Sequence, residues 1–186
     1  YAQVGKSFGF PTHCYLAASD GKLVDAQAGL ESGVTAIVGA LAGVNMISGA
    51  GMLDFLVCQS AEKLVIDAEG IAMAQRLLRG IGTPTETLAT AMFAQTGLKG
   101  EFLKLKETRR LFPGEQHLPS KIIDRGSVRA WQEAGGLDAF GRAKVRVTEL
   151  LNGYQRPKLS EDVERELFAI VQREAKAVGL ETLPGV

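Results

Sequence analysis

Three aspartates stand in or beside two short loops that each follow a predicted strand. Asp20 lies in the turn Ser19–Gly21, Asp25 follows it, and Asp54 closes the loop Ser48–Asp54. Carboxylates gathered at one edge of a protein favour a cationic ligand. The alternative is structural, because aspartate is common in turns and at the first position of helices. The sequence favours a helix cap for Asp25 and leaves both roles open for Asp20 and Asp54.

Two aromatic residues accompany these carboxylates. Tyr15 lies in the first strand and Phe55 follows Asp54 directly. The faces of aromatic rings attract ammonium groups, so these two side chains could form an aromatic wall around a cation. Packing in the core is the alternative, and the sequence favours it because the chain has few aromatic residues.

Other chemistries are disfavoured by spacing. The loop SGAGMLD places Asp54 where a dinucleotide-binding motif has its third glycine, and a carboxylate there would repel a pyrophosphate. His13 and Cys14 are neighbours in a strand, so their side chains point to opposite faces and do not form a catalytic Cys–His pair. His117 stands far from both, without the spacing of a zinc site, and a loop histidine with a structural hydrogen bond is expected there. No resident metal is predicted.

Composition narrows the class of protein further. Lys and Arg total 21, Asp and Glu total 21, and the formal net charge is zero, which disfavours a nucleic-acid partner. The least polar stretch, Val34–Ile47, is too short to cross a membrane. Two cysteines in apolar surroundings suit a reducing, cytoplasmic location. The first residues resemble neither a signal peptide nor a transit peptide. Because they also lack a starting Met, we expect the chain to be a piece of a longer protein.

The elements that must position these loops follow from hydrophobic patterning. Thr12–Ala18 is a predicted strand, Asp25–Val44 a helix that is apolar on nearly every side, and Asn45–Ser48 a second strand. Strand, helix and strand with short connections make a parallel β-α-β unit, whose loops at the carboxyl ends of the strands lie at one edge. The helix is expected to be buried.

The rest of the chain reads as helices. Ser60–Arg79 carries Leu64, Ala68, Ile71 and Leu78 on one stripe. Glu161, Asp162 and Glu164 mark the first turn of the last helix, and Val163, Leu167, Ile170 and Val178 its expected buried face. Trp131 is expected to anchor the packing of the helical tail. The further predicted helices are 83–96, which starts with the capping sequence Thr83–Glu86, then 101–111, 127–134, 138–152 and 160–178.

Five segments resemble the trimethylamine methyltransferase superfamily in order and spacing. The similarity extends over nearly the whole chain. The segments are Ser19–Glu31 (SDGKLVDAQAGLE), Ala40–Asp54 (ALAGVNMISGAGMLD), Ser60–Glu69 (SAEKLVIDAE), Ile122–Trp131 (IIDRGSVRAW) and Leu150–Tyr154 (LLNGY).

The resemblance implies a fold of the α/β class, a TIM-type β/α barrel more than twice as long as this chain. Residues 1–100 would supply the last strands and helices of the barrel, and residues 101–186 a C-terminal helical extension packed on it. The family transfers a methyl group from a methylated amine to the cobalt of a corrinoid, which a separate protein carries. The trimethylamine branch has pyrrolysine in its site. This chain has no nonstandard residue, which favours the branch that acts on quaternary amines such as glycine betaine.

Combined with the strand-end positions, the resemblance suggests roles for six substrate-binding residues. Asp20 and Asp54 would steady the ammonium cation, with Tyr15 at its side. Asn45 and Ser48 would orient a substrate carboxylate, and Gly49 belongs to the same loop. No catalytic residue is assigned.

Two alternatives remain open. A half barrel leaves strand edges and apolar faces uncovered, so the chain could be a non-catalytic fragment or subunit that associates with itself or with a missing N-terminal half. It could also bind small ammonium compounds without transferring a methyl group.

Overall fold

The computed structural model describes residues 1–82, 89–180 and 183. The capping sequence predicted at Thr83–Glu86 lies outside these residues. The chain divides into two compact units, Tyr1–Leu151 and Asn152–Val186, and each is described by itself. The proposed division between barrel and extension near residue 100 stays a prediction.

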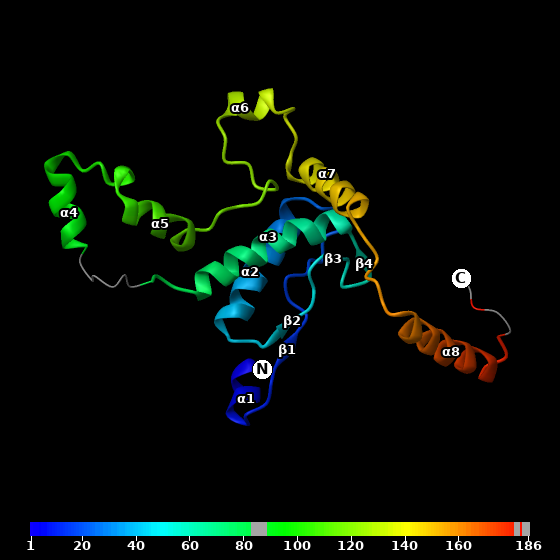
Figure 1. The fold of residues 1–186 in the computed structure, drawn as a ribbon. Helices are drawn as coiled ribbons and strands as arrows, with labels where there is room; N and C mark the ends of the chain where they lie inside the picture. Colours follow the sequence, from blue (N-terminus) through cyan, green and yellow to red (C-terminus); the bar gives the residue numbers. More distant parts are fainter. Residues whose placement is uncertain (83–88, 181–182, 184–186) are drawn as a thin grey trace. The chain divides into compact units, whose positions relative to one another are not determined.

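A parallel β-α-β unit forms the centre of the first unit (Figure 1). It consists of β1 (His13–Cys14), α2 (Ala26–Leu41) and β2 (Met46–Ile47). This confirms the predicted unit, although both strands are shorter than the sequence patterns indicated. Its place in a TIM-type barrel stays a prediction. The paired Cα positions are His13 with Met46 and Cys14 with Ile47.

The loop after β2 contains a small hairpin that the sequence did not predict. Two-residue strands β3 (Met52–Leu53) and β4 (Cys58–Gln59) pair in antiparallel orientation. Strands this short show no alternation of apolar and polar residues, so periodicity cannot reveal them. The connecting turn holds Asp54, Phe55 and Leu56 in the left-handed region, with φ of 48°, 55° and 70°.

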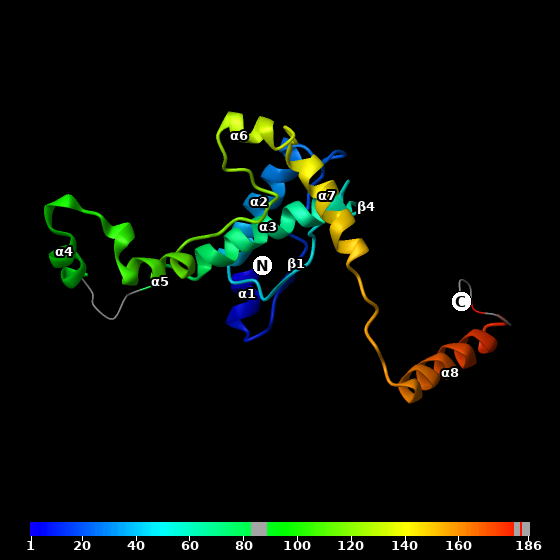
Figure 2. The same cartoon turned by 45° about the horizontal axis from the view of Figure 1, so that its top comes forward.

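Helices α2 and α3 (Ala61–Leu78) lie against each other in both views (Figures 1 and 2). The carboxylate of Asp25 accepts hydrogen bonds from the first amides of α2, which confirms the predicted cap. The Ser60 hydroxyl caps α3 in the same way, and Gly80 follows its end with φ of 68°.

Only one stripe of α2 is buried, so the prediction of a helix buried all round is wrong. Its apolar side chains on the other side are exposed in the described chain, because α3 and the strands cover a single face. The buried stripe consists of Ala28, Ser32, Ala36 and Gly39, and the exposed set includes Leu30, Val34, Val38 and Leu41.

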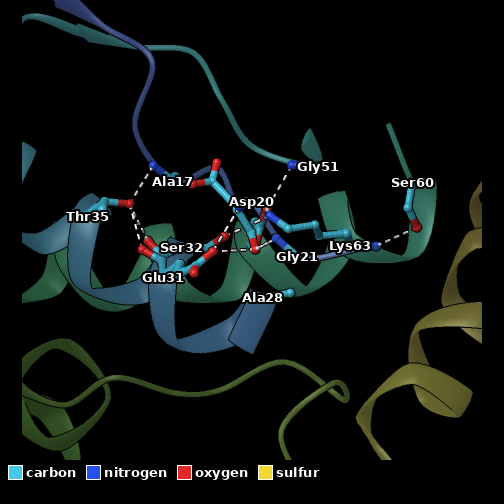
Figure 3. A network of polar contacts seen from close by, with 12 residues as sticks. Ala17, Asp20, Gly21, Ala28, Glu31, Ser32, Thr35, Gly51, Ser60 and Lys63 are labelled. Atoms are coloured by element: carbon cyan, nitrogen blue, oxygen red, sulfur yellow. Dashed lines mark hydrogen bonds and ion pairs between the residues drawn. The ribbon is translucent and has the colours of Figure 1, made fainter. Parts of the chain in front are cut away.

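A charged pair is buried between the two helices. Lys63 Nζ lies 2.5 Å from Asp67 Oδ2, and the two side chains are 1% and 2% exposed. The same ammonium donates to Ser32 Oγ on α2 at 2.7 Å, and the Gly51 amide donates to Asp67 Oδ2 at 2.7 Å (Figure 3). The pair thus joins α2, α3 and the loop after β2.

The predicted apolar stripe of α3 is not its buried one. Leu64 and Leu78 are exposed, whereas Lys63, Asp67 and Ala74 are buried against α2. Hydrophobicity alone favours the Leu64 stripe, but the small side chains of α2 leave room for an ion pair whose hydrogen bonds are satisfied.

Shorter helices complete the first unit. The helices predicted at 127–134 and 138–152 are confirmed, and the helix predicted at 101–111 is a 3₁₀ turn followed by a helix. None of the described helices combines the length and the apolar character that a membrane span requires. The remaining elements of this unit are α1 (Ala2–Ser7), α4 (Thr90–Thr96), η1 (Gly97–Lys99), η2 (Phe102–Lys104), α5 (Lys106–Glu115), α6 (Val128–Glu133) and α7 (Ala139–Asn152).

Two predicted structural side chains are found in this region. His117 Nε2 lies 2.7 Å from Oε1 of the buried Glu69 on α3, which confirms a loop histidine with a structural hydrogen bond. Burial would raise the pKa of Glu69, but hydrogen bonds from Ser120 and His117 outweigh it and hold the pKa below its ordinary value. Trp131 donates its indole N–H to Leu137 O at 2.8 Å and closes the α6–α7 connection.

The second unit contains α8 (Glu161–Ala177), preceded by Ser160 and followed by Gly179 with φ of 83°. The predicted helix is confirmed. The prediction of a buried face on this helix is wrong. No described element of this unit covers that face, and it is exposed at Val163, Leu167, Ile170 and Val178.

The buried pair gives a first prediction. Replacing Asp67→Asn leaves the Lys63 ammonium buried without a counter-charge, which typically costs about 3–5 kcal/mol. We expect the free energy of unfolding, measured by urea denaturation, to fall by about that amount. The exposed pair Glu101–Lys104 provides the control, since Glu101→Gln should cost less than about 1 kcal/mol. Equal, small effects of both substitutions would show that the buried pair is dispensable.

Candidate functional site

The loops that follow β1 and β2 lie side by side, as the β-α-β topology led us to expect. The Ser19 amide donates to Met52 O at 3.1 Å, and the Asp54 amide donates to Gly21 O at 3.1 Å. These backbone hydrogen bonds bring Asp20 and the Ser48–Asp54 loop to one edge of the unit.

A hollow of about 470 Å³ opens at this edge. It combines aromatic, apolar and acidic side chains, a composition that suits a small organic cation. Its lining includes Tyr15, Leu16, Asp20, Glu31, Phe55 and Leu56.

The carboxylate of Asp20 is available for a ligand. Asp20 is exposed, and within the described part of the chain its carboxylate has no hydrogen-bond or ion-pair partner. Only its backbone groups are engaged: the amide donates to Glu31 and the carbonyl accepts from Lys22. A fixed loop with a free carboxylate can neutralise a cation at little cost in ordering.

Glu31 holds this loop in place (Figure 3). Its Oε2 accepts from Ser19 Oγ at 2.6 Å and from the Asp20 amide at 2.9 Å, and its Oε1 accepts from Gln27 at 2.9 Å. These bonds, the one from Ser19 foremost, then those from Gln27 and the Asp20 amide, hold the pKa of Glu31 below its ordinary value. One helical turn further, Thr35 Oγ1 accepts from the Ala17 amide at 3.0 Å.

Asp54 and Phe55 both contact Lys22. The Lys22 ammonium lies 3.2 Å from Asp54 Oδ1 and 4.7 Å from the centre of the Phe55 ring. The left-handed turn at these residues therefore places an aromatic ring and a carboxylate together. Backbone strain of this kind typically costs about 1–3 kcal/mol per residue and occurs often at functional sites.

His13, Tyr15 and Ser48 form a polar cluster at the same ends of the strands. His13 Nε2 lies 2.5 Å from Ser48 Oγ, and the Tyr15 ring stands edge-on to His13 with centroids 4.9 Å apart. His13 is exposed and Cys14 is half-buried. Ser48 and Tyr15 thus both contact His13, which carried no predicted role in the site.

Gly49 and Asn45 have structural partners. A Cβ at Gly49 would collide with the carbonyl oxygen of Leu16, so only glycine allows this close approach of the two loops. Asn45 lies at the amino end of β2, where its Oδ1 accepts from the Thr12 amide at 3.0 Å. The structure therefore places Asn45 away from the carboxyl ends of the strands, where the other candidates gather.

Two residues of this site, Glu31 and Lys22, carried no functional prediction. Glu31 could have been singled out from the sequence, because it is the one carboxylate within the apolar helix α2. Lys22 stands only two residues after Asp20, but its contacts depend on the turn at Asp54. No group of three or more His, Cys, Asp or Glu side chains that could hold a metal ion occurs within residues 1–82, 89–180 and 183.

The described residues thus form a parallel β-α-β unit with two carboxylates and two aromatic rings around a hollow at its strand ends. The family model for trimethylamine methyltransferase (MTTB) matches residues 1–179. The chain belongs to this family, as the sequence motifs indicated.

Relatives with assigned names agree. The chain is 35% identical over 178 residues to the trimethylamine methyltransferase MttB2 of Methanosarcina mazei, covering 95% of this chain and 35% of that protein. Identity and coverage are the same for the MttB protein of Methanosarcina barkeri. Identity to the glycine betaine methyltransferase of Desulfitobacterium hafniense (strain Y51) is 31% over 181 residues, 97% of this chain and 37% of that protein. The chain therefore spans about a third of the length of these relatives.

The bonds of Glu31 give a second prediction. Ser19 Oγ and the Asp20 amide both donate hydrogen bonds to the negatively charged carboxylate of Glu31. Glu31→Gln removes this charge and weakens both bonds, so hydrogen exchange at the Asp20 amide should accelerate several-fold. Because the pKa of Glu31 is lowered in the folded protein, Glu31 is fully ionised above its ordinary pKa of 4.5, and the protection of the Asp20 amide from exchange is complete there. Protection is lost as pH falls below that value through the folded pKa. Amide exchange followed by NMR across this range measures both effects.

Glu62 supplies the control for this experiment. Glu62 lies in the first turn of α3, where hydrogen bonds from its own backbone amide and from the capping residue Ser60 also lower its pKa. No hydrogen bond or ion pair joins Glu62 to residues 15–22 or 48–56 in the described chain. Glu62→Gln should leave the exchange of the Asp20 amide unchanged. An equal effect of Glu31→Gln and Glu62→Gln would argue against a positioning role for Glu31.

Proposed function

We propose that this chain is the C-terminal part of a methyltransferase that moves a methyl group from a methylated amine to the cobalt of a corrinoid carried by a partner protein. Membership in the trimethylamine methyltransferase family supports the reaction type. The observation that carries the proposal is the hollow in which the unpaired carboxylate of Asp20 stands beside Tyr15 and Phe55.

The reaction requires a positively charged nitrogen. The C–N bond breaks with its electron pair left on nitrogen, and the cobalt supplies the pair for the new bond to carbon, so an ammonium becomes a neutral amine. A quaternary or protonated nitrogen is therefore a better leaving group than a neutral one. The rings of Tyr15 and Phe55 and the carboxylate of Asp20 suit the charged reactant.

The likeness to two differently named relatives leaves two kinds of amine substrate to choose between. One relative bears the name trimethylamine methyltransferase and another glycine betaine methyltransferase. The sequence contains only standard residues, whereas the resemblance implies pyrrolysine in the site of the trimethylamine branch. The identity to the glycine betaine methyltransferase is 31%, only a few per cent below the 35% to the trimethylamine methyltransferase. We assign a quaternary amine of the glycine betaine kind to this chain.

The partners in this proposal are the amine and a separate corrinoid protein. The residues of this chain bind and orient the ammonium so that one methyl group faces the incoming cobalt, and alignment supplies much of the rate. A TIM-type barrel that includes residues 1–100 would place the hollow at the carboxyl ends of its strands, where such barrels bind ligands.

Asp20 is expected to act mainly on binding. Its carboxylate stabilises the cationic substrate more than the transition state, in which the positive charge on nitrogen is already falling. In the full-length protein, Asp20→Asn should raise KM for the amine about two- to five-fold, as loss of an exposed ion pair does, and leave kcat unchanged or slightly higher. Steady-state demethylation with the corrinoid protein as acceptor measures both constants.

Asp25→Ser is the matched control for Asp20→Asn. Asp25 is five residues away in sequence, and serine keeps the helix cap while removing the carboxylate. The control should not change KM. A KM for Asp20→Asn equal to that of the unsubstituted enzyme would remove Asp20 from the site.

A second candidate function is self-association without catalysis. The observation in its favour is the exposed apolar side of α2, which carries Leu30, Val34 and Val38. Exposed apolar surface of this kind is usually covered by a partner. Light scattering of the 186-residue chain should then give the mass of an oligomer that dissociates on Val34→Lys, and a monomer would rule this function out.

A further inference from the structure

Lys22 is the one ammonium group that contacts the residues around the hollow in the described chain. Its Nζ donates to the backbone oxygen of Asp20 at 2.8 Å and pairs with Asp54 Oδ1 at 3.2 Å. It also lies over the Phe55 ring, 4.7 Å from the centroid. Asp20 and Phe55 line the hollow, so a positive charge is fixed at its edge.

This ammonium has a hydrogen-bond donor to spare. A lysine carries three N–H donors, and Lys22 makes one hydrogen bond with them, to the backbone oxygen of Asp20, while Asp54 Oδ1 is its ion-pair partner. No further oxygen or nitrogen acceptor of this ammonium belongs to residues 1–82, 89–180 or 183, and the side chain is 63% exposed. Lys22 therefore keeps donor capacity for solvent or for a ligand, beside two residues that line the hollow.

The residues first assigned to a substrate carboxylate already have partners. Asn45 accepts hydrogen bonds from Thr12, and Ser48 is bonded to His13. Lys22 is better suited, because it is charged and has a free donor.

The charges at the edge of the hollow distinguish two kinds of ligand. Lys22 repels a plain cation, which weakens the attraction that Asp20 exerts. A ligand that carries a carboxylate close to its ammonium can meet Asp20 and Lys22 with opposite charges at once. Such complementarity determines specificity more than affinity.

We propose that Lys22 is a specificity-determining residue that binds the carboxylate of a zwitterionic quaternary ammonium substrate while Asp20, Tyr15 and Phe55 hold its ammonium. This inference rests on the proposed function and adds the residue that selects among amines. Asp54 has a positioning role, because its carboxylate and the left-handed turn hold the lysine at the hollow.

The test compares two probes that differ in the group next to the trimethylammonium. Glycine betaine carries a carboxylate, and choline carries a hydroxyl. Titration calorimetry on the full-length protein gives Kd for each, and the ratio of the two constants is the readout. For Lys22→Gln we expect glycine betaine to lose about five- to ten-fold in affinity relative to choline. Lys22→Arg, which keeps the charge, should retain most of the preference.

A double variant separates direct binding from a change in local charge. Lys22→Gln alone also frees the Asp54 carboxylate, which by itself would repel glycine betaine. In Lys22→Gln/Asp54→Asn both charges are removed together, so the loss in preference should persist if Lys22 binds the carboxylate. A ratio that returns to the unsubstituted value would overturn the inference and assign the effect to Asp54.

Lys144→Gln is the matched control. Lys144 lies over the Phe140 ring at 4.6 Å on α7, a similar contact outside the hollow, and its substitution should leave the ratio unchanged. An unchanged ratio in Lys22→Gln, or tighter binding of both probes, would overturn the role of Lys22 while leaving the proposed function intact. If neither probe binds the unsubstituted protein, the proposed function fails and this inference fails with it.

Discussion

The ion pair between Lys63 and Asp67 is the constraint on which the described α/β unit depends. A buried ammonium needs a counter-charge, and Asp67, one turn along α3, supplies it. The remaining hydrogen bond of the ammonium, to Ser32 on α2, restricts how α3 lies against α2. Asp67 also accepts a hydrogen bond from the Gly51 amide, so the buried pair fixes the loop after β2 as well. The position of one edge of the hollow thus depends on an ion pair within α3 whose two members also bind α2 and the loop.

Helix α2 extends this constraint to the other edge. Ser32 faces the buried pair, whereas Glu31 and Thr35 on the adjacent side bind the loop after β1. Small residues along the helix allow the approach: a Cβ at Gly39 would lie within 2.8 Å of the side chains of Leu16 and Ile47. One helix therefore couples the packing of the interior to the geometry of the loop that presents Asp20.

The order of elements could be predicted from the sequence because it depends on local signals. Caps such as Asp25 and Ser60, glycine stops such as Gly80, and the alternation of strand and helix all act within a few residues. The placement of Asp20 beside the second loop followed from topology alone.

What the sequence could not reveal depends on contacts distant in the chain. Hydrophobicity assigns Lys63 and Asp67 to the surface of α3, but both are buried. They lie four residues apart, yet the groups that complete their hydrogen bonds, Gly51 and Ser32, lie 16 and 31 residues away. Burial on α2 and α8 was overestimated, since an apolar side chain does not say whether the described chain supplies its cover. The position of Lys22 could not be predicted, because its contacts with Asp54 and Phe55 depend on the backbone conformation at residues 54–56.

That left-handed turn has an evolutionary consequence. Three successive residues with side chains occupy a conformation that glycine would adopt without penalty, so mutations towards glycine at Asp54 or Leu56 would make the fold more robust. They would also loosen the position of the Phe55 ring and weaken the contacts that hold Lys22. Thermal stability and ligand discrimination therefore favour different residues in this segment.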